Sequence, residues 1–300
     1  MQGNISKKNT AWFSPAFLYN IPMKTSDLAN TIIEGDSLKI LPEIEDNTID
    51  SVVTSPPYFA DKEYETLKKT SDNMLENYQK YLHELLIPVF LECYRILKPG
   101  GHLWLNIDDV HTSIKSVLKK NIVLPTHALL LAELSKQYDY KEMILWRKIR
   151  GKHSSGGANR MLGSYGRFRS PGSIPIVQEV EYILWFRKPG DRDDVTDDRR
   201  KESALTPKQF RQFGMQVWDI DAERDKSILH PAPYPIEIPR RCILLSSFKN
   251  DLILDPFMGA GSTGIAAINT GRKYVGIELN RKYADRARTR IKYETSNIFG

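Results

Sequence analysis

The segment DLILDPFMGAGSTGIAA, residues 251–267, carries the pattern that decides the fold. A short apolar run is followed by Gly259, Gly261 and Gly264, and then by a helix-like apolar stretch. Glycines between a strand and a helix allow a tight turn and let a ligand approach the backbone near the helix N-terminus. The spacing G-x-G-x-x-G is weak evidence by itself, because a strand–helix turn can need glycine for its geometry alone.

The next segment, KYVGIELN at 273–280, indicates a nucleoside site. It is a second apolar strand with Glu278 at its end, where an acid commonly binds the ribose hydroxyls of an adenosine-containing cofactor. Asp255 and Phe257, at the mouth of the glycine turn, suit a cationic ligand tail and an adenine or sulfonium contact, respectively. No lysine follows the last glycine as in a triphosphate-binding loop, so NAD and S-adenosylmethionine both remain open on this pattern.

Expected strands and helices also alternate through the rest of the chain. Strands are expected at 30–36, 49–55, 102–108, 141–148 and 180–188, and an amphipathic helix kinked at Pro88 is expected over 73–97. Strands separated by helices in both halves predict an α/β fold around a mostly parallel sheet. The mixed-charge run at 189–203 lacks apolar periodicity and is interpreted as an exposed loop.

Composition narrows the class of protein. The 300 residues are 41% hydrophobic and 27% charged, without a signal peptide or an apolar run long enough for a membrane span. Cys93 and Cys242 are far apart, which predicts two buried thiols and neither a disulfide framework nor a metal site. We therefore expect a cytoplasmic protein that does not bind membranes.

Positive charge is concentrated in one window. The net charge is +6, and residues 141–170 contain a single acid, Glu142, beside many basic residues and a stretch rich in glycine and small polar residues. Such a loop is either a solvated surface or a phosphate-binding one. The clustering of positive charge favours a loop that binds nucleic acid. The candidate nucleic-acid-binding residues are Arg147, Lys148, Arg150, Lys152, Arg160, Arg167 and Arg169. The stretch 190–215 is a further candidate for such contact.

The sequence TSPPY, residues 54–58, places a rigid turn at the end of an expected strand. The Ser55 hydroxyl and the Pro56 carbonyl are two acceptors that could hold an exocyclic amine, while Tyr58 stacks on its ring. Such acceptors would draw out the nitrogen lone pair, so the amine could attack an electrophilic methyl group directly. The simpler interpretation of this turn is a proline-rich strand end with an exposed tyrosine.

Both motifs resemble those of the amino-directed DNA methyltransferases. TSPPY at 54–58 is similar to their catalytic motif, and DPFMGAGST at 255–263 is similar to their S-adenosylmethionine motif. The catalytic motif comes first, with a variable segment between the two, as in the beta class. Further segments that resemble the family, such as RILKPGGHLWLNI and VEYILWF, extend the similarity over most of residues 31–293.

The resemblance implies a Rossmann-like S-adenosylmethionine-dependent methyltransferase fold with circularly permuted motif order, in which strands 252–255 and 50–54 lie side by side. It implies four catalytic residues, Ser55, Pro56, Pro57 and Tyr58. It assigns cofactor binding to Asp36, Asp255, Phe257, Gly259, Gly261, Ser262, Thr263 and Glu278, and matches His230, Pro231 and Pro235 to the segment that covers the methionine end.

The implied organisation has four parts. They are an N-terminal arm at 1–30, a catalytic half at 31–148, a small inserted basic and target-recognition region at 149–227 that includes the core strand 180–187, and a cofactor-binding half at 228–300.

The implied activity is transfer of a methyl group to the 4-amino group of a flipped-out cytosine in duplex DNA. Ser55 stands where adenine-modifying members carry Asp, which favours cytosine, and the adenine 6-amino group is the alternative. RNA methylation and an inactive DNA-binding regulator are weaker alternatives. Methylation at carbon five needs a cysteine beside proline, which the sequence lacks. A separately acting restriction endonuclease is an expected partner, and the sequence leaves monomer and homodimer open.

Overall fold

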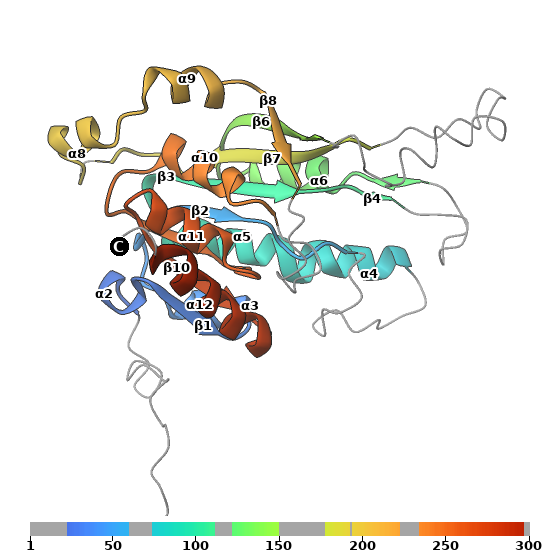
Figure 1. The fold of residues 1–300 in the computed structure, drawn as a ribbon. Coiled ribbons are helices and arrows are strands. Elements are labelled where there is room, and N and C mark those ends of the chain that lie inside the picture. Colours follow the sequence, from blue (N-terminus) through green and yellow to red (C-terminus); the bar gives the residue numbers. More distant parts are fainter. Residues whose placement is uncertain are drawn as a thin grey trace, which may run out of the picture.

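The computed structural model describes residues 23–59, 74–111, 122–149, 178–192, 194–222 and 234–296. Within them, an eight-stranded sheet has the order β1-β10-β9-β2-β3-β7-β6-β8 (Figure 1). Its strands are β1 (Thr31–Glu34), β2 (Ile49–Thr54), β3 (Leu97–Ile107), β6 (Asp139–Ile149), β7 (Val180–Arg187), β8 (Val217–Asp221), β9 (Leu252–Asp255) and β10 (Lys273–Glu278). A separate two-stranded sheet pairs β4 (Val110–His111) with β5 (Val123–Leu124).

The large sheet is mostly parallel, as the sequence predicted. Among its described strands, only β7 runs against its neighbours, β3 and β6. Strands β9 and β2 are adjacent, since Ser51 pairs with Ile253 and Val52 with Leu254, which confirms the predicted neighbourhood of two distant segments. The carboxyl ends of β1, β10, β9, β2 and β3 therefore meet at one border of the sheet, here called the carboxyl edge.

Helices cover both faces of the sheet (Figure 1). One layer consists of α3 (Ser37–Ile40), η1 (Leu41–Glu43), α4 (Met74–Lys80), η3 (Tyr81–Leu86), α5 (Ile87–Ile96) and α6 (Thr126–Leu134), with α2 (Thr25–Leu28) beside it. The other consists of α10 (Glu237–Ser246), α11 (Ser262–Asn269) and α12 (Arg281–Ser296). Each layer buries its own apolar cluster against the sheet, so strands such as β9 carry no exposed residue. The predicted parts 31–148, 149–227 and 228–300 all contribute strands to this one sheet.

The long helix expected over 73–97 is present but not uniform. Its middle, η3, is a π-helix located just before Pro88, which occupies the first turn of α5. Proline has no backbone N–H to donate to the carbonyl four residues earlier, which explains why the regular hydrogen-bond ladder is interrupted here. The irregularity therefore extends over the turns before Pro88 instead of being a single kink.

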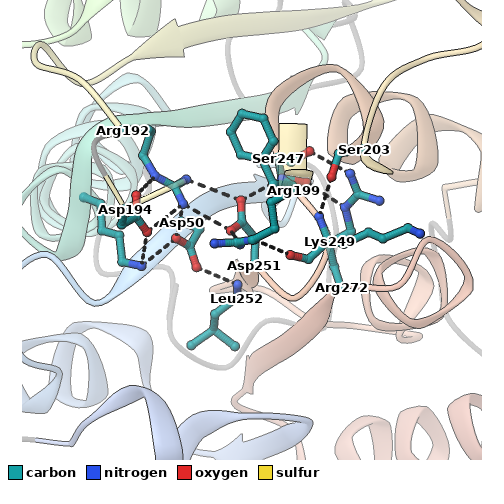
Figure 2. A network of polar contacts seen from close by, with 12 residues as sticks. Asp50, Arg192, Asp194, Arg199, Ser203, Ser247, Lys249, Asp251, Leu252 and Arg272 are labelled. Atoms are coloured by element: carbon teal, nitrogen blue, oxygen red, sulfur yellow. Dashed lines mark hydrogen bonds and ion pairs between the residues drawn. The ribbon is translucent and has the colours of Figure 1, made fainter. Parts of the chain in front are cut away.

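The mixed-charge run at 189–203 is not simply an exposed loop, and this expectation is corrected. Thr196 accepts a hydrogen bond from the Arg199 N–H and begins α8 (Asp197–Glu202), which is followed by α9 (Pro207–Phe213). Arg192 is buried, and its side chain pairs with Asp50 and Asp251 (Figure 2). An apolar pattern could not reveal this segment, because a buried ion cluster holds it in place.

This ion cluster lies where β2 and β9 begin, so it is at the border of the sheet opposite the carboxyl edge. The stretch 190–215 includes Arg192 and Arg199 of this cluster, and its expected contact with DNA stays a prediction.

Cys93 and Cys242 are free and buried, as predicted. Burial raises the pKa of both thiols well above the ordinary value. Among the helices of the described ranges, none has the length and apolar character that a membrane span requires.

Candidate active site

A cleft opens at the carboxyl edge of the sheet and encloses about 510 Å³, including its open mouth. Its lining residues come from the ends of β1, β2, β9 and β10 and from η3: Asp36, Ser37, Ser55, Pro57, Leu85, Pro256, Phe257, Ile277, Glu278 and Leu279. Ser55 and Pro57 of the proline turn therefore face the same cavity as Pro256 and Phe257, which precede the glycine turn.

Glu278 closes β10 with its carboxylate held by two backbone N–H groups. Gly259 donates to Oε2 at 2.8 Å, and Asn280 donates to Oε1 at 2.9 Å. Burial raises the pKa of this carboxyl group. Each carboxylate oxygen can accept more than one hydrogen bond, so both retain capacity for a pair of ribose hydroxyls. This arrangement fits the predicted role of Glu278.

Asp36 and Phe257 provide two further surfaces of the cleft. Asp36 is the N-cap of α3, where its Oδ1 accepts the Leu38 N–H at 3.1 Å. Phe257 is partly buried and packs edge-on against Phe90, with 6.4 Å between ring centroids. A second carboxylate and a flat apolar ring suit an adenosine group, so these residues also fit the predicted cofactor.

Asp255 occupies a different place from the one expected. It is fully buried, and Thr54 and Thr263 each donate a hydroxyl hydrogen bond to its carboxylate at 2.6 Å, while the Phe257 N–H donates at 3.0 Å. Burial raises the pKa of Asp255 to about 6. The side chain ties the ends of β2 and β9 to the start of α11, which corrects the expectation that it meets a cationic ligand tail directly.

The glycine turn and the first residues of α11 follow Phe257 in the chain and do not line the cleft. Gly259 and Gly261 have φ values of 51° and 82°, which favour glycine. A Cβ at Gly261 would lie 3.2 Å from the Ala287 Cβ, so this glycine also allows α12 to pack closely. Ser262 donates to the Tyr234 carbonyl at 2.9 Å. None of these residues is among those lining the cleft, and neither is Thr263; their predicted cofactor contact stays a prediction.

The turn of TSPPY, residues 54–58, for which the family resemblance implies a catalytic role, is here called the catalytic turn and is anchored on both sides. The Tyr81 hydroxyl donates to the Pro57 carbonyl at 2.8 Å. The Thr54 bond to Asp255 joins residues 201 positions apart and couples the end of β2 to the end of β9. Within the described ranges, no hydrogen bond to the Pro56 carbonyl is found, so this oxygen keeps its full acceptor capacity.

Tyr58 is partly buried and turns its hydroxyl into the protein, where it donates to Glu181 Oε2 at 2.9 Å. Burial, and then the negative charge of Glu181, raises the pKa of Tyr58 well above its ordinary value. Asn106, near the end of β3, contacts the same hydroxyl at 3.1 Å. The sequence analysis missed Asn106 and Glu181, although each is a lone polar residue in an apolar strand, which is a signal that could have identified them.

Of the candidate DNA-binding residues, the structure describes two, Arg147 and Lys148. Arg147 is exposed and pairs with Asp219 through two contacts of 2.6 and 2.7 Å. Lys148 pairs with the buried Glu181 and therefore lies beside the catalytic turn instead of standing free on the surface. The remaining candidates, Arg150, Lys152, Arg160, Arg167 and Arg169, lie outside the described residues, as do His230 and Pro231.

Several known proteins are similar to this chain in sequence, and one of them in a solved structure. The type II methyltransferase M.MjaI of Methanocaldococcus jannaschii is 32% identical over 278 residues, which cover 83% of this chain and 87% of that protein. The DNA adenine methyltransferase YhdJ of Escherichia coli is 28% identical over 272 residues, 87% of this chain and 82% of that protein. TTHA0409 of Thermus thermophilus, a DNA modification methylase crystallised with S-adenosyl-L-methionine, superposes with a TM-score of 0.70 at 31% identity, covering 88% of this chain and 94% of that one.

The family model for the N6/N4 methyltransferases, described as DNA methylase, matches residues 49–289. This range contains the catalytic turn and the glycine-rich segment, of which Ser55, Pro57, Pro256 and Phe257 line the cleft. The chain therefore belongs to the N6/N4 DNA methylase family and is an S-adenosyl-L-methionine-dependent DNA methyltransferase.

Proposed function

We propose that this enzyme methylates the 4-amino group of a cytosine at a specific site in duplex DNA, within a restriction–modification system. The observation that carries the proposal is the position of Ser55 in the same cleft as Glu278. The cleft thus combines an acceptor for a base amine with a carboxylate suited to the cofactor ribose. The relation to a type II methyltransferase supports the restriction–modification setting, with a cognate endonuclease acting separately.

The residues of the turn are suited to hold a base amine. When bound, S-adenosyl-L-methionine supplies an electrophilic methyl group. Ser55 and the Pro56 carbonyl accept hydrogen bonds from the target amine, and the two prolines keep both acceptors fixed. Cys93 and Cys242 lie buried in α5 and α10, so neither offers the nucleophile that methylation at carbon five requires.

A paired base cannot reach the cleft, so the target nucleotide leaves the stack. In the proposed complex Tyr58 provides the stacking face. Arg147 and the basic residues around 150–169 contact phosphates, and a few of them read base edges.

The adenine 6-amino group is the second candidate, because YhdJ is named as an adenine methyltransferase. The decisive experiment incubates the enzyme with S-adenosyl-L-methionine and unmodified plasmid, total RNA or free nucleosides. Nucleosides from each reaction are then identified by mass spectrometry. We expect 4-methylcytosine from plasmid alone. Methyladenine from plasmid would transfer the proposal to the adenine amine. Methylated nucleosides from RNA, without any from plasmid, would overturn the DNA assignment.

Ser55→Asp tests the reason for choosing cytosine. An aspartate accepts hydrogen bonds but cannot donate one, whereas a serine can do both. We expect the variant to retain activity while the ratio of adenine to cytosine products rises by about tenfold, the equivalent of ~1.4 kcal/mol. Product analysis of a plasmid library with randomised sites measures this ratio. An unchanged product and an unchanged rate would remove the argument from Ser55.

Glu278→Ala should weaken S-adenosyl-L-methionine binding by about 10- to 100-fold, because hydrogen bonds to a charged group contribute roughly 1.5–3 kcal/mol. Calorimetric titration measures the Kd. The matched control is Glu34→Ala: Glu34 pairs in register with Glu278 on β1, but it is exposed and does not line the cleft. Equal losses of affinity in both variants would contradict the assigned role of Glu278.

A further inference from the structure

A buried polar network lies directly behind the catalytic turn. It joins Tyr58 of the turn, Asn106 of β3, Lys148 of β6 and Glu181 of β7. Glu181 Oε2 accepts from Tyr58 at 2.9 Å and from the Asn106 amide at 3.0 Å, while Oε1 pairs with the Lys148 ammonium. Asn106 and Glu181 are only 2% and 4% exposed. Three different strands thus supply side chains to this network, and two of these side chains, Asn106 and Glu181, contact the Tyr58 hydroxyl.

The carboxylate of Glu181 determines the direction of these hydrogen bonds. A carboxylate paired with lysine only accepts, so Tyr58 must donate to it, and Asn106 must present its NH₂ group. In this orientation Asn106 Oδ1 is buried without a hydrogen-bond partner among the described residues. A buried unpaired oxygen is unfavourable, which indicates that the orientation of the amide is imposed by Glu181.

The orientation of the Asn106 amide also determines which hydrogen bonds Ser55 can make. The Asn106 NH₂ group lies 3.3 Å from Ser55 Oγ, so the serine oxygen accepts there. The Tyr58 hydroxyl has a single hydrogen, which it donates to Glu181, so it does not donate to Ser55. The Asn106 NH₂ group can only donate, so Ser55 Oγ faces it as an acceptor, and the second lone pair of this oxygen remains for the target amine.

We propose that Glu181 is a positioning residue that, through Asn106, holds Ser55 as a hydrogen-bond acceptor for the target amine. This inference rests on the proposed function, in which Ser55 meets the amine. Glu181 itself does not line the cleft, so its effect is on the methyl-transfer step and not on cofactor binding.

The test is Glu181→Gln, measured in single-turnover methylation of plasmid and in calorimetric titration of S-adenosyl-L-methionine. A glutamine has a similar shape but can donate to Tyr58 and Asn106, so the direction of the network is no longer fixed. We expect the rate to fall at least about tenfold while the cofactor Kd stays within about twofold. The matched control is Glu179→Gln, two residues earlier and exposed, which should retain the wild-type rate.

A second experiment distinguishes the loss of the Ser55 orientation from general damage to the site. Ser55→Asp supplies an acceptor that needs no orienting, so adding Glu181→Gln to Ser55→Asp should slow the reaction less than adding it to the wild type. A wild-type rate in Glu181→Gln, or an equal penalty in both backgrounds, would overturn the inference. A wild-type enzyme that does not methylate DNA at all would instead overturn the proposed function, so the two failures are distinguishable.

Discussion

Tyr58→Ala should slow single-turnover DNA methylation by about 100-fold or more while leaving S-adenosyl-L-methionine affinity nearly unchanged. Stacking of a base on an aromatic side chain contributes roughly 1–3 kcal/mol. The substitution also removes the hydroxyl that donates to the buried Glu181, and a hydrogen bond to a charged group contributes roughly 1.5–3 kcal/mol. Tyr58 is absent from the residues that line the cleft, so the cofactor should bind normally.

Tyr58→Phe is the matched control, because it keeps the ring and removes only the hydroxyl. Its rate should lie between those of the wild type and Tyr58→Ala, and the difference from the wild type measures the link to Glu181. The cofactor Kd of all three proteins is measured by calorimetry. A loss of cofactor affinity as large as the loss of rate would show that Tyr58 does not act on the base.

Arg192→Met should lower the free energy of unfolding by about 3–5 kcal/mol, the usual effect of removing one partner from a buried ion pair. Arg192 contacts Asp50 at 2.7 Å and Asp251 at 3.1 Å, and both carboxylates are almost fully buried (Figure 2). Lys98 and Arg199 also contact these acids, so part of their charge stays compensated. Chemical denaturation monitored by circular dichroism measures the change.

Two further variants test the physical reason. In Arg192→Met combined with Asp251→Asn, one uncompensated charge is removed, so part of the lost stability should return. Lys201→Met breaks only a distant, exposed contact of 3.7 Å to Asp198 and should leave the midpoint essentially unchanged. If the double variant is no more stable than Arg192→Met, lost packing of the long arginine side chain is the better explanation.

Much of the site could be predicted from sequence because its elements have local signatures. Glu278 closes an apolar strand after a glycine turn, and the prolines of TSPPY end another strand; each pattern is contained within a few residues. The family resemblance also predicted that β2 and β9 are neighbours, which the strand pairing confirms. Asp255 shows the limit of such patterns. Its position in the motif was clear, but its burial under Thr54 and Thr263 depends on contacts that no local pattern contains.

The sequence by itself determined the fold class, the family resemblance and the two motifs at the strand ends beside the cleft. These features could be predicted because hydrophobic periodicity, glycine and proline determine the conformation of short local segments. Only the tertiary structure decided which polar groups meet. It placed Glu181 and Asn106 behind Tyr58, and it buried Arg192 between Asp50 and Asp251. The physical reason is that a buried charge or amide is tolerated only where partners surround it, and here those partners come from strands far apart in the chain.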